Sequence, residues 1–325
     1  MTSFSLNRYT EPLKGVLSYV ASSVTGRPVL WGMPLSAGIE LTNCCNLACP
    51  ECVSGSGLMK RGRGYMSRTL FEKFIMESIP GLLHANLYFQ GEPMMHPLFF
   101  DFIEIASKIR LTVSTNGHFL DKDSTERLAA SSLSELVISL DGMDSRTYGI
   151  YRHNGEFDRV INGIRLLAVA LRHSKSTMKL RLQFLVNRYN ESQIPEARKF
   201  ASEVDAVLKL KSMQVIDSER TESWLPIQEK FRRYRKENER NVIKGKLVNR
   251  CSRLWISPVV TWDGFVVPCC FDKDAEYILG DLNKTSFRDI WYGEKYQEFR
   301  KRLLSNRTGI GICNNCTEGL RNVIV

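Results

Sequence analysis

The sequence predicts an α/β fold, in which a partial, TIM-like (β/α)6 barrel is followed by a small C-terminal domain. Short runs of β-branched or apolar residues alternate with segments of helical period, which is the pattern of repeated βα units with a parallel sheet. The nine cysteines fall in two groups, and a polar, charged segment precedes the second group. A chain of 325 residues is long enough for one large or two unequal domains.

Six of the apolar runs are expected to form the strands of the barrel. They span residues 37–42, 86–90, 111–115, 136–140, 179–186 and 206–213. Helical periodicity predicts helices at residues 68–78, 98–108, 121–131, 156–173 and 191–204. Barrels of this kind carry their chemistry at the C-terminal ends of the strands, so functional residues are expected in the loops that follow them.

The barrel is expected to span residues 36–215, and the segments before and after it differ from it in composition. Residues 1–35 contain a modest apolar stretch and are expected to form an amphipathic helix that packs on the barrel. This interpretation is favoured over a signal peptide and over a helix that touches a membrane surface. Residues 216–250 are polar and charged and are expected to form a linker helix. Residues 251–325 form the small domain.

The composition is that of an ordinary globular protein, with 43% hydrophobic and 25% charged residues. The net charge is +10, and the densest basic run lies at residues 230–246. This run could attract an acidic substrate, but Glu237 and Glu239 interleave with its basic residues, which favours a solvated helix face. The sequence holds no recognisable RNA-binding motif, so we expect no nucleic-acid partner.

The placement of the cysteines indicates metal binding rather than disulfides. Four cysteines lie between positions 44 and 52, and five lie between positions 251 and 316. The odd total and the adjacent pairs Cys44–Cys45 and Cys269–Cys270 fit metal binding in a reducing compartment. We therefore expect a cytoplasmic protein.

The first group contains the most informative spacing in the chain, Cys45-x3-Cys49-x2-Cys52, just after the first expected strand. Soft thiolates select zinc, copper(I) or iron–sulfur clusters. Structural zinc nearly always has four protein ligands, so three cysteines without a local fourth leave one coordination position open. An open position at a metal centre suggests catalysis.

The segment ELTNCCNLACPEC resembles the signature of the radical SAM enzymes. The resemblance implies that Cys45, Cys49 and Cys52 hold a 4Fe–4S cluster whose unique iron binds S-adenosylmethionine (SAM). It further implies that an electron from a cellular donor, such as flavodoxin or ferredoxin, cleaves SAM to methionine and a 5′-deoxyadenosyl radical. That radical abstracts a hydrogen atom from the substrate. The cofactor carries the hard chemistry, and the protein orients it and excludes water.

Loops after the expected strands resemble the SAM-binding motifs of the same family. Gly91-Glu92-Pro93 resembles a motif whose backbone and carboxylate bind the SAM amino group, although Gln90 replaces its first glycine. Arg152, in TYGIYRHNGEF, resembles the arginine that pairs with the SAM carboxylate, and a guanidinium fork suits that group. The resemblance implies further SAM contacts from the third, fourth and fifth strands, made by Thr115, Asn116, Ser139, Gln183 and Val186.

Each of these segments also has an ordinary structural interpretation. The Gly-Glu-Pro, Asn-Gly and Asp-Gly sequences are common turns, and Arg152 fits an exposed arginine at a helix start. Val186 fits a core position equally well. The order of the segments after successive strands favours the functional interpretation.

The second cysteine group supplies four thiolates, from Cys251, Cys269, Cys313 and Cys316. Four sulfur ligands can close a zinc site or an iron–sulfur site, but zinc ribbons usually have two CxxC pairs and this group has one. The spacing resembles that of the twitch domain, the short relative of the SPASM extension of radical SAM enzymes. This resemblance implies an auxiliary 4Fe–4S cluster.

Two residues beside this group are candidate catalytic residues. Cys270 adjoins Cys269, and either thiol could be the cluster ligand. The spacing from Gly264 favours Cys269, which leaves Cys270 as a buried thiol or as a hydrogen-atom donor. Asp272 is a candidate general base, although a carboxylate in a turn is most often solvated.

These features predict an oxidoreductase-type radical SAM enzyme that oxidises or tailors a small molecule, with the auxiliary cluster accepting an electron. Two alternatives stay open. One is the maturation of a ribosomally made peptide by thioether formation, epimerisation or crosslinking. The other is a non-enzymatic iron–sulfur or zinc scaffold, against which the SAM-binding residues argue. The sequence does not identify the substrate.

Overall fold

The computed structural model describes residues 3–79, 81–216, 221–238 and 240–320. The chain divides into two compact units. The first unit consists of Met1–Cys44, Lys60–Leu111 and Leu247–Gly319, and the second consists of Cys45–Met59, Thr112–Lys246 and Leu320–Val325. The first unit therefore combines segments from both halves of the sequence.

The strands of the first unit come from distant parts of the chain. β1 (Ser36–Ile39) pairs in parallel with β2 (His84–Asn86) on one side and with β9 (Val259–Val260) on the other. Beyond β9, the short strands β10 (Phe265–Val267) and β11 (Gly280–Asp281) continue the sheet in antiparallel orientation. The segment that carries the second cysteine group is thus joined to β1 by main-chain hydrogen bonds.

Besides the long N-terminal helix described below, the first unit contains the helices α2 (Arg68–Ser78), α3 (Phe99–Ile105), α9 (Arg253–Ile256), α10 (Phe287–Tyr292) and α11 (Glu294–Asn306). α2 begins at residue 68 because the Ser67 side chain accepts the Leu70 N–H at 3.2 Å and satisfies a free helix donor. Its Phe71 stacks on Phe102 of α3, with 4.3 Å between ring centroids. Such aromatic pairs contribute to the core of the unit together with buried aliphatic side chains.

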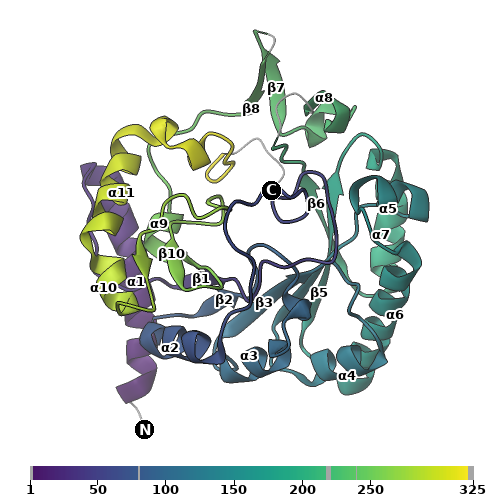
Figure 1. Cartoon of the computed structure of the whole chain (residues 1–325), viewed down its shortest axis with the longest axis horizontal. Coiled ribbons are helices and arrows are strands. Elements are labelled where there is room, and N and C mark those ends of the chain that lie inside the picture. Colours follow the sequence, from purple (N-terminus) through teal and green to yellow (C-terminus); the bar gives the residue numbers. More distant parts are fainter. Residues whose placement is uncertain (1–2, 80, 217–220, 239, 321–325) are drawn as a thin grey trace. The chain divides into compact units, whose positions relative to one another are not determined.

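The second unit is a run of parallel βα units. Its strands are β3 (Arg110–Thr115), which starts at the boundary between the units, β4 (Glu135–Ser139), β5 (Lys179–Val186) and β6 (Val207–Ser212). Its longer helices are α4 (Lys122–Ala130), α5 (Ser145–Tyr151), α6 (Phe157–Ser174) and α7 (Ile194–Glu203). Figure 1 shows these helices following one another around the outer side of β4, β5 and β6. Loops at the C-terminal strand ends are therefore left free to carry function.

The five expected helices and five of the six expected strands are present, with small shifts of their bounds. The second expected strand, at residues 86–90, overlaps β2 only at Asn86, where β2 ends. The following residues bend into the short 3-10 helix η1 (Pro93–Met95). Gly91 makes this bend with φ +74°, a value that a strand residue does not adopt.

The prediction of a linker helix at residues 216–250 is wrong. The described residues of this segment form α8 (Thr221–Trp224), the 3-10 helix η4 (Glu229–Phe231) and an antiparallel hairpin of β7 (Tyr234–Glu237) and β8 (Arg240–Ile243); residues 217–220 and 239 lie outside the description. Asn238 begins the hairpin loop with φ +49°, which asparagine tolerates. Tyr234 is buried at the base of the hairpin, and this burial favours a strand over a solvated helix.

A long helix precedes the barrel, α1 (Ser3–Thr25). The chain after α1 turns back along it, because the Val29 N–H donates to the Ser22 Oγ (2.8 Å) and the Trp31 N–H to the Ser18 Oγ (2.9 Å). This contact is close: a Cβ on Gly32 would lie 2.5 Å from the Glu11 carbonyl oxygen. Among the described residues, no helix is both long and apolar enough to cross a membrane.

Candidate active site

The loop from Cys45 to Cys52, in the second unit, carries the first cysteine motif. Its backbone is anchored, because the Ala48 N–H donates to the His153 carbonyl oxygen (3.1 Å) and the Cys52 N–H to the Cys49 carbonyl oxygen (3.2 Å). Cys49 is buried, and Cys45 and Cys52 are half-buried. The three thiols therefore belong to a fixed loop.

Two side chains that the sequence predicts to bind SAM lie against these sulfurs. The Nη1 group of Arg152 donates to the Cys49 Sγ (3.7 Å), and the Nδ2 group of Asn116 lies 3.9 Å from the Cys45 Sγ. Asn116 directly follows β3 and Arg152 directly follows α5, so two successive βα units each send one polar side chain to the cysteine loop. The structure thus brings both residues together with the first motif.

An ion pair fixes Arg152. Its Nη2 and Nε groups lie 2.6 and 2.7 Å from the Asp141 Oδ2, and the Asp141 side chain is fully buried. The other carboxylate oxygen of Asp141 accepts the Leu185 N–H at 2.6 Å. Asp141 therefore links the ends of β4 and β5 to the arginine that contacts Cys49. The sequence signal for this partner is its place at a strand end, in a turn that also fits an ordinary βα connection.

Asn116 is held by its neighbours in a defined orientation. Its Nδ2 group donates to the Asn46 Oδ1 (2.7 Å), while its Oδ1 accepts the His118 N–H (3.0 Å). The Nε2 atom of His118 in turn accepts the Glu156 N–H (2.8 Å). Thr115 is buried at the end of β3 and accepts the Gly117 N–H on its Oγ1 (3.1 Å). These contacts fix the turn after β3 beside the cysteine loop.

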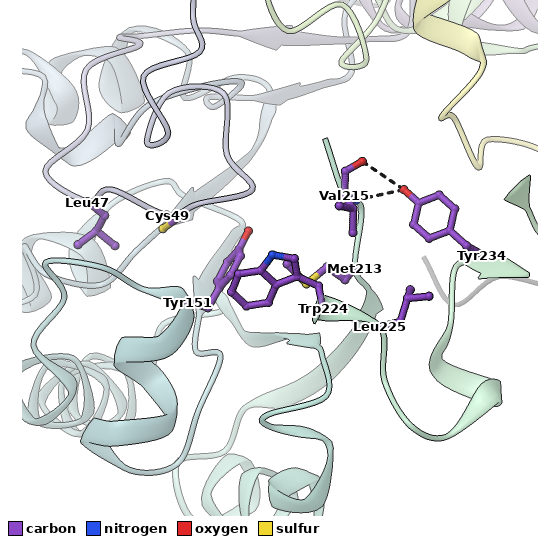
Figure 2. Close-up of a cluster of buried hydrophobic side chains, with 8 residues drawn as sticks. All are labelled: Leu47, Cys49, Tyr151, Met213, Val215, Trp224, Leu225 and Tyr234. Carbon is purple, nitrogen blue, oxygen red and sulfur yellow. Dashed lines mark hydrogen bonds between the residues drawn. The ribbon is translucent and has the colours of Figure 1, made fainter. Parts of the chain in front are cut away.

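A buried apolar cluster lies against the cysteine loop. It consists of Leu47, Cys49, Tyr151, Met213, Val215, Trp224, Leu225 and Tyr234, and Cys45 and Cys52 pack against it. Figure 2 shows the Trp224 ring beside Tyr151 and the Tyr234 hydroxyl hydrogen-bonded to the main chain of Val215. No local pattern in the sequence predicts this shell, because its members come from five separate segments. An apolar shell keeps water from a metal centre.

Burial also affects the cysteine thiols themselves. It raises the pKa of the Cys49 thiol, and the charge of Arg152 opposes this rise. Because the thiolate is the metal ligand, metal binding has to displace the Cys49 proton. Arg152 therefore favours the charged form of the sulfur that it contacts.

The remaining predicted residues of the second unit lie on β4 and β5. Ser139 ends β4 and is paired in register with Gln183 of β5. Gln183 is half-buried on one face of β5, whereas Val186 is fully buried on the opposite face together with Leu182. Because neighbouring strand residues alternate between faces, Gln183 and Val186 cannot line the same surface. The structure places the Val186 side chain in the core, an interpretation that the sequence left open, and the expected contact of Val186 with SAM stays a prediction.

Gly91 and Glu92 lie in the first unit, against the residues that immediately precede the cysteine motif in the chain. A Cβ on Gly91 would lie 2.5 Å from the Thr42 carbonyl oxygen and 2.6 Å from that of Cys44. The Glu92 N–H donates to the Cys44 carbonyl oxygen (2.8 Å), and its buried carboxylate accepts the Met94 N–H (3.1 Å). Only glycine fits at position 91, and the Glu92 carboxylate caps η1.

The second cysteine group converges in the first unit. Cys251, Cys269, Cys313 and Cys316 line one small cavity, and among the described residues Cys270 is not part of this lining. Burial raises the pKa of the Cys251 thiol to about 12, with Arg307 opposing the rise. Burial likewise raises the pKa of the Cys269, Cys313 and Cys316 thiols. The cavity therefore gathers the four predicted sulfur ligands.

Arg307 supplies a positive charge to this cavity. It is buried, and it donates to the carbonyl oxygens of Arg250 (2.8 Å) and Glu318 (3.0 Å). Its Nη2 group also lies 3.6 Å from the Cys316 Sγ, whereas the Glu318 carboxylate pairs with Arg253. A buried cation is costly unless an anion compensates it. Four thiolates around a metal cluster are such an anion, so the charge of Arg307 fits a cluster in this cavity.

The two predicted catalytic residues lie next to this cavity. Asp272 is fully buried, so the alternative interpretation, a solvated carboxylate in a turn, is wrong. Its Oδ1 and Oδ2 accept the Glu276 (2.8 Å) and Tyr277 (2.9 Å) N–H groups, and burial raises its pKa. Cys270 is half-buried. Asp272 closes the turn after the cysteines, and the proposed roles of both residues in catalysis stay predictions.

In the described part of the chain, no three His, Cys, Asp or Glu side chains are close enough to hold a metal ion. Assignment of the metal therefore depends on the donor set. All nine cysteines are free thiols, and seven of them belong to the two motifs. A sulfur-only donor set selects iron–sulfur clusters, zinc or copper(I).

Comparison with known families distinguishes among these metals. Residues 39–201 match the radical SAM superfamily, and residues 251–317 match SPASM, an iron–sulfur cluster-binding domain. The chain therefore belongs to the radical SAM superfamily and carries a SPASM domain at its C-terminal side. These two domains confirm the expected cofactors, which are 4Fe–4S clusters and SAM.

Curated relatives include enzymes with different products. The mycofactocin maturase MftC of Mycobacterium tuberculosis (strain ATCC 25618 / H37Rv) is 31% identical over 180 residues, which cover 54% of this chain and 44% of that protein. This chain thus spans less than half the length of that relative. The SAM-dependent 2-deoxy-scyllo-inosamine dehydrogenase of Niallia circulans is 22% identical over 286 residues, covering 86% of this chain and 90% of that protein.

Solved structures confirm the predicted fold class. Streptococcus suis SuiB bound to SAM matches with a TM-score of 0.63 at 16% identity, covering 94% of this chain and 77% of SuiB. BtrN in complex with AdoMet and 2-DOIA matches with a TM-score of 0.55 at 17% identity, covering 90% of this chain and 96% of BtrN. The fold is therefore the α/β partial barrel with a small C-terminal domain that the sequence predicts.

Proposed function

We propose that this protein cleaves SAM reductively and uses the resulting radical to modify a substrate. The observation that carries this proposal is the convergence of Arg152 and Asn116 on the sulfurs of Cys49 and Cys45. A protein that only carried electrons would need no such polar side chains around a three-cysteine loop. This argues against a non-enzymatic iron–sulfur or zinc scaffold.

Three cysteines would hold the first cluster, namely Cys45, Cys49 and Cys52. When bound, this cluster and SAM supply one electron and a 5′-deoxyadenosyl radical that takes a hydrogen atom from the substrate. The apolar shell of Tyr151, Met213 and Trp224 excludes water from the cysteine side of this site. Exclusion of water protects radical chemistry from side reactions.

Arg152 would bind the SAM carboxylate. Asp141 occupies its Nη2 and Nε groups, which leaves Nη1, on the side of Cys49, for a second anion. A buried arginine with one fixed partner is preorganised, since its side chain is already ordered before a ligand arrives. Further polar contacts to SAM would come from Thr115, Asn116, Ser139 and Gln183, and Gly91-Glu92 would bind its amino group.

Cys251, Cys269, Cys313 and Cys316 would hold the auxiliary cluster. Cys269 is favoured over Cys270 because Cys269 lines the cavity that contains the other three sulfurs. Replacement of Cys269 by serine should therefore lower the bound iron by about half. Replacement of Cys270 by serine should leave the iron content unchanged, and the reverse pattern would make Cys270 the ligand.

Oxidation or tailoring of a small molecule is the first substrate proposal. It is supported by the relative from Niallia circulans, whose length this chain nearly spans. An electron donor such as flavodoxin or ferredoxin and a cytoplasmic location are part of this proposal, and the nine free thiols support a reducing compartment. Asp272 would accept a proton from the substrate as a general base, and Cys270 would be a donor of a hydrogen atom.

Maturation of a peptide is the second proposal. It is supported by the relative named as a mycofactocin maturase and by a structural neighbour, SuiB, crystallised with its precursor peptide. The hairpin of β7 and β8 also offers a short, mostly exposed strand, Tyr234–Glu237. An extended peptide can add to such an edge by main-chain hydrogen bonds.

Anaerobic reconstitution tests the shared chemistry. The protein with both clusters is incubated with dithionite and SAM, and 5′-deoxyadenosine is measured by chromatography. We expect Cys49→Ala to abolish this product. Cys44→Ala is the matched control, because Cys44 lies beside the motif without belonging to it, and it should retain the product. Absence of 5′-deoxyadenosine from the fully loaded protein would contradict the enzymatic proposal.

Mass spectrometry then separates the two substrate classes. The active protein is incubated either with peptides encoded by short neighbouring genes or with polyhydroxylated small molecules. A two-hydrogen loss from the small molecule supports dehydrogenation. A change of mass in a peptide with no change in the small molecules supports maturation.

A further inference from the structure

The long helix before the barrel exposes its apolar side. Among the described side chains of α1, at residues 10–25, five large aliphatic ones are exposed, with exposed fractions of 58% for Leu13, 42% for Val16, 47% for Leu17, 50% for Val20 and 82% for Val24. Their spacing places them on one face of a helix with 3.6 residues per turn. We call this face the α1 stripe.

The opposite face of α1 packs on the protein mostly through small or polar residues, and beside them the Tyr19 ring packs on Trp255, with 5.8 Å between ring centroids. Gly15, Ser18 and Ser22 are buried. Both serines accept main-chain N–H groups from the returning segment at residues 29–31. Trp255 of α9 also binds this segment, by donating from its Nε1 to the Val29 carbonyl oxygen (3.0 Å). An ordinary surface helix has the reverse arrangement, with its apolar face toward the core.

The α1 stripe is continuous and uncharged. From Leu13 to Val24 it extends over about 16 Å, at about 1.5 Å per residue. Lys14 lies beside the stripe rather than within it, and its Nζ pairs with the Glu11 Oε1 (2.8 Å). Exposed apolar residues are normal when they are scattered, but a contiguous row indicates a binding surface.

Size and charge indicate what covers the stripe. Five aliphatic side chains bury at most a few hundred Å2, whereas a stable dimer needs about 800 Å2 from each partner. An interfacial helix needs a smaller apolar area, because lipid adapts to its shape. Electrostatic attraction to anionic lipids also adds to the free energy gained from apolar burial. The chain has a net charge of +10, and Arg27 and Trp31 are exposed just after the helix. Arginine and tryptophan both favour the membrane–water boundary.

We propose that α1 is an interfacial helix, which docks this protein on an anionic lipid surface through the α1 stripe. The helix lies along the surface and does not cross the membrane. Its small, polar face stays bound to the protein through Ser18 and Ser22. This inference is independent of the proposed catalysis, because the stripe contains no residue of the candidate active site.

Vesicle flotation tests the proposal with the full chain carrying its clusters. The vesicles contain either phosphatidylcholine alone or equal parts of phosphatidylcholine and phosphatidylglycerol. The test variant is Leu17→Ser/Val20→Ser. The matched control is Leu166→Ser/Val169→Ser, which removes two similarly exposed aliphatic side chains from α6 (43% and 44% exposed). Iron content and melting temperature verify that both variants fold.

We expect the unchanged protein and the α6 variant to float with the anionic vesicles. The α1 variant should bind at least about tenfold more weakly, because it replaces two of the five apolar side chains of the stripe. Failure of the unchanged protein to float with either vesicle overturns the proposal. Equal flotation of the α1 variant also overturns it, since the lipid contact then lies elsewhere. A dimer in sedimentation velocity that the α1 variant abolishes, without vesicle binding, assigns the stripe to a second copy instead.

Discussion

Arg152 and Asp141 form a buried ion pair, in which two guanidinium nitrogens lie 2.6 and 2.7 Å from one carboxylate oxygen. The same arginine reaches the Cys49 sulfur with its third nitrogen. The pair therefore connects the end of β4 to the cysteine loop. Because both charges are shielded from water, the loss of one partner leaves an uncompensated charge in the interior.

Asp141→Asn should lower the free energy of unfolding by about 3 kcal/mol, since it removes the negative partner of a buried arginine. The shape of the side chain and the acceptor for the Leu185 N–H are retained. Urea denaturation followed by circular dichroism measures the change. Glu135→Gln, on the same strand, is the control, because its partner Arg181 is partly exposed. That variant should lose no more than about 1 kcal/mol, and equal losses in both variants would contradict the role of burial.

Gly91→Ala should destabilise the protein by more than the strain of a left-handed residue alone. An added Cβ would meet the Thr42 and Cys44 carbonyl oxygens at 2.5 and 2.6 Å. Gly26→Ala is the matched control, because Gly26 has a similar φ of +68° and nothing within 4 Å of its Cβ position. We expect the free energy of unfolding to fall by about 1 kcal/mol in the control and by at least about 3 kcal/mol in Gly91→Ala. Similar melting temperatures for the two variants would rule out the close approach.

Arg307→Met should lower the reduction potential of the auxiliary cluster by an amount on the order of tens of millivolts. The positive charge of Arg307 should favour the reduced, more negative cluster, because its Nη2 group lies 3.6 Å from the sulfur of Cys316, a proposed ligand. A redox titration followed by EPR spectroscopy measures this shift without any substrate. Arg307→Lys should shift the potential less, and Lys301→Met, an exposed change on the preceding helix α11, should not shift it. An unchanged potential in Arg307→Met would exclude the electrostatic role.

His118 should make stability depend on pH in the acidic range. Burial lowers the pKa of His118 below its ordinary value, with the Asn116 hydrogen bond opposing this shift. The unfolded chain therefore binds the proton first as the pH falls below about 6.5, and the folded state loses stability from there down to the lower folded pKa. Protonation also removes the acceptor for the Glu156 N–H.

Denaturation at pH 7.0 and pH 5.5 measures this dependence. His118→Gln should reduce the difference between the two stabilities, because the titrating group is gone. His173→Gln, at an exposed position of α6, should preserve the difference. A difference that persists in full in His118→Gln would assign the pH dependence to other groups.

Patterns among residues close in the sequence predicted the elements whose bounds depend on those same residues. The bounds of α2 were predictable because Ser67 precedes an apolar helical pattern and caps it. The cysteine loop was predictable because three ligands of one cluster must lie close in the sequence when a short loop holds them. Arg152 and Asn116 were predicted to bind SAM from the resemblance of their segments to radical SAM motifs, and the structure places both side chains beside the cysteine loop.

Contacts between distant segments were not predictable in the same way. The hairpin of β7 and β8 replaces an expected helix because Tyr234 is buried against Val215, a contact that charge patterning does not encode. The buried face of Val186 depends on the register of β5, which a run of apolar residues does not fix. Arg307 belongs to no recognisable sequence motif. Only the folded structure reveals that its cation lines the same cavity as the four cysteines of the second group.

The parallel pairing of β1 with β9 sets an order of events during protein synthesis. Gly38 leaves the ribosome long before its partner Val259, on the order of ten to forty seconds earlier at ordinary elongation rates. Throughout that time β1 presents an open strand edge, which is prone to wrong pairing. A nascent chain that stops before β9 keeps this edge, so premature termination in the second half of the message should yield an aggregating product rather than a separately folded barrel.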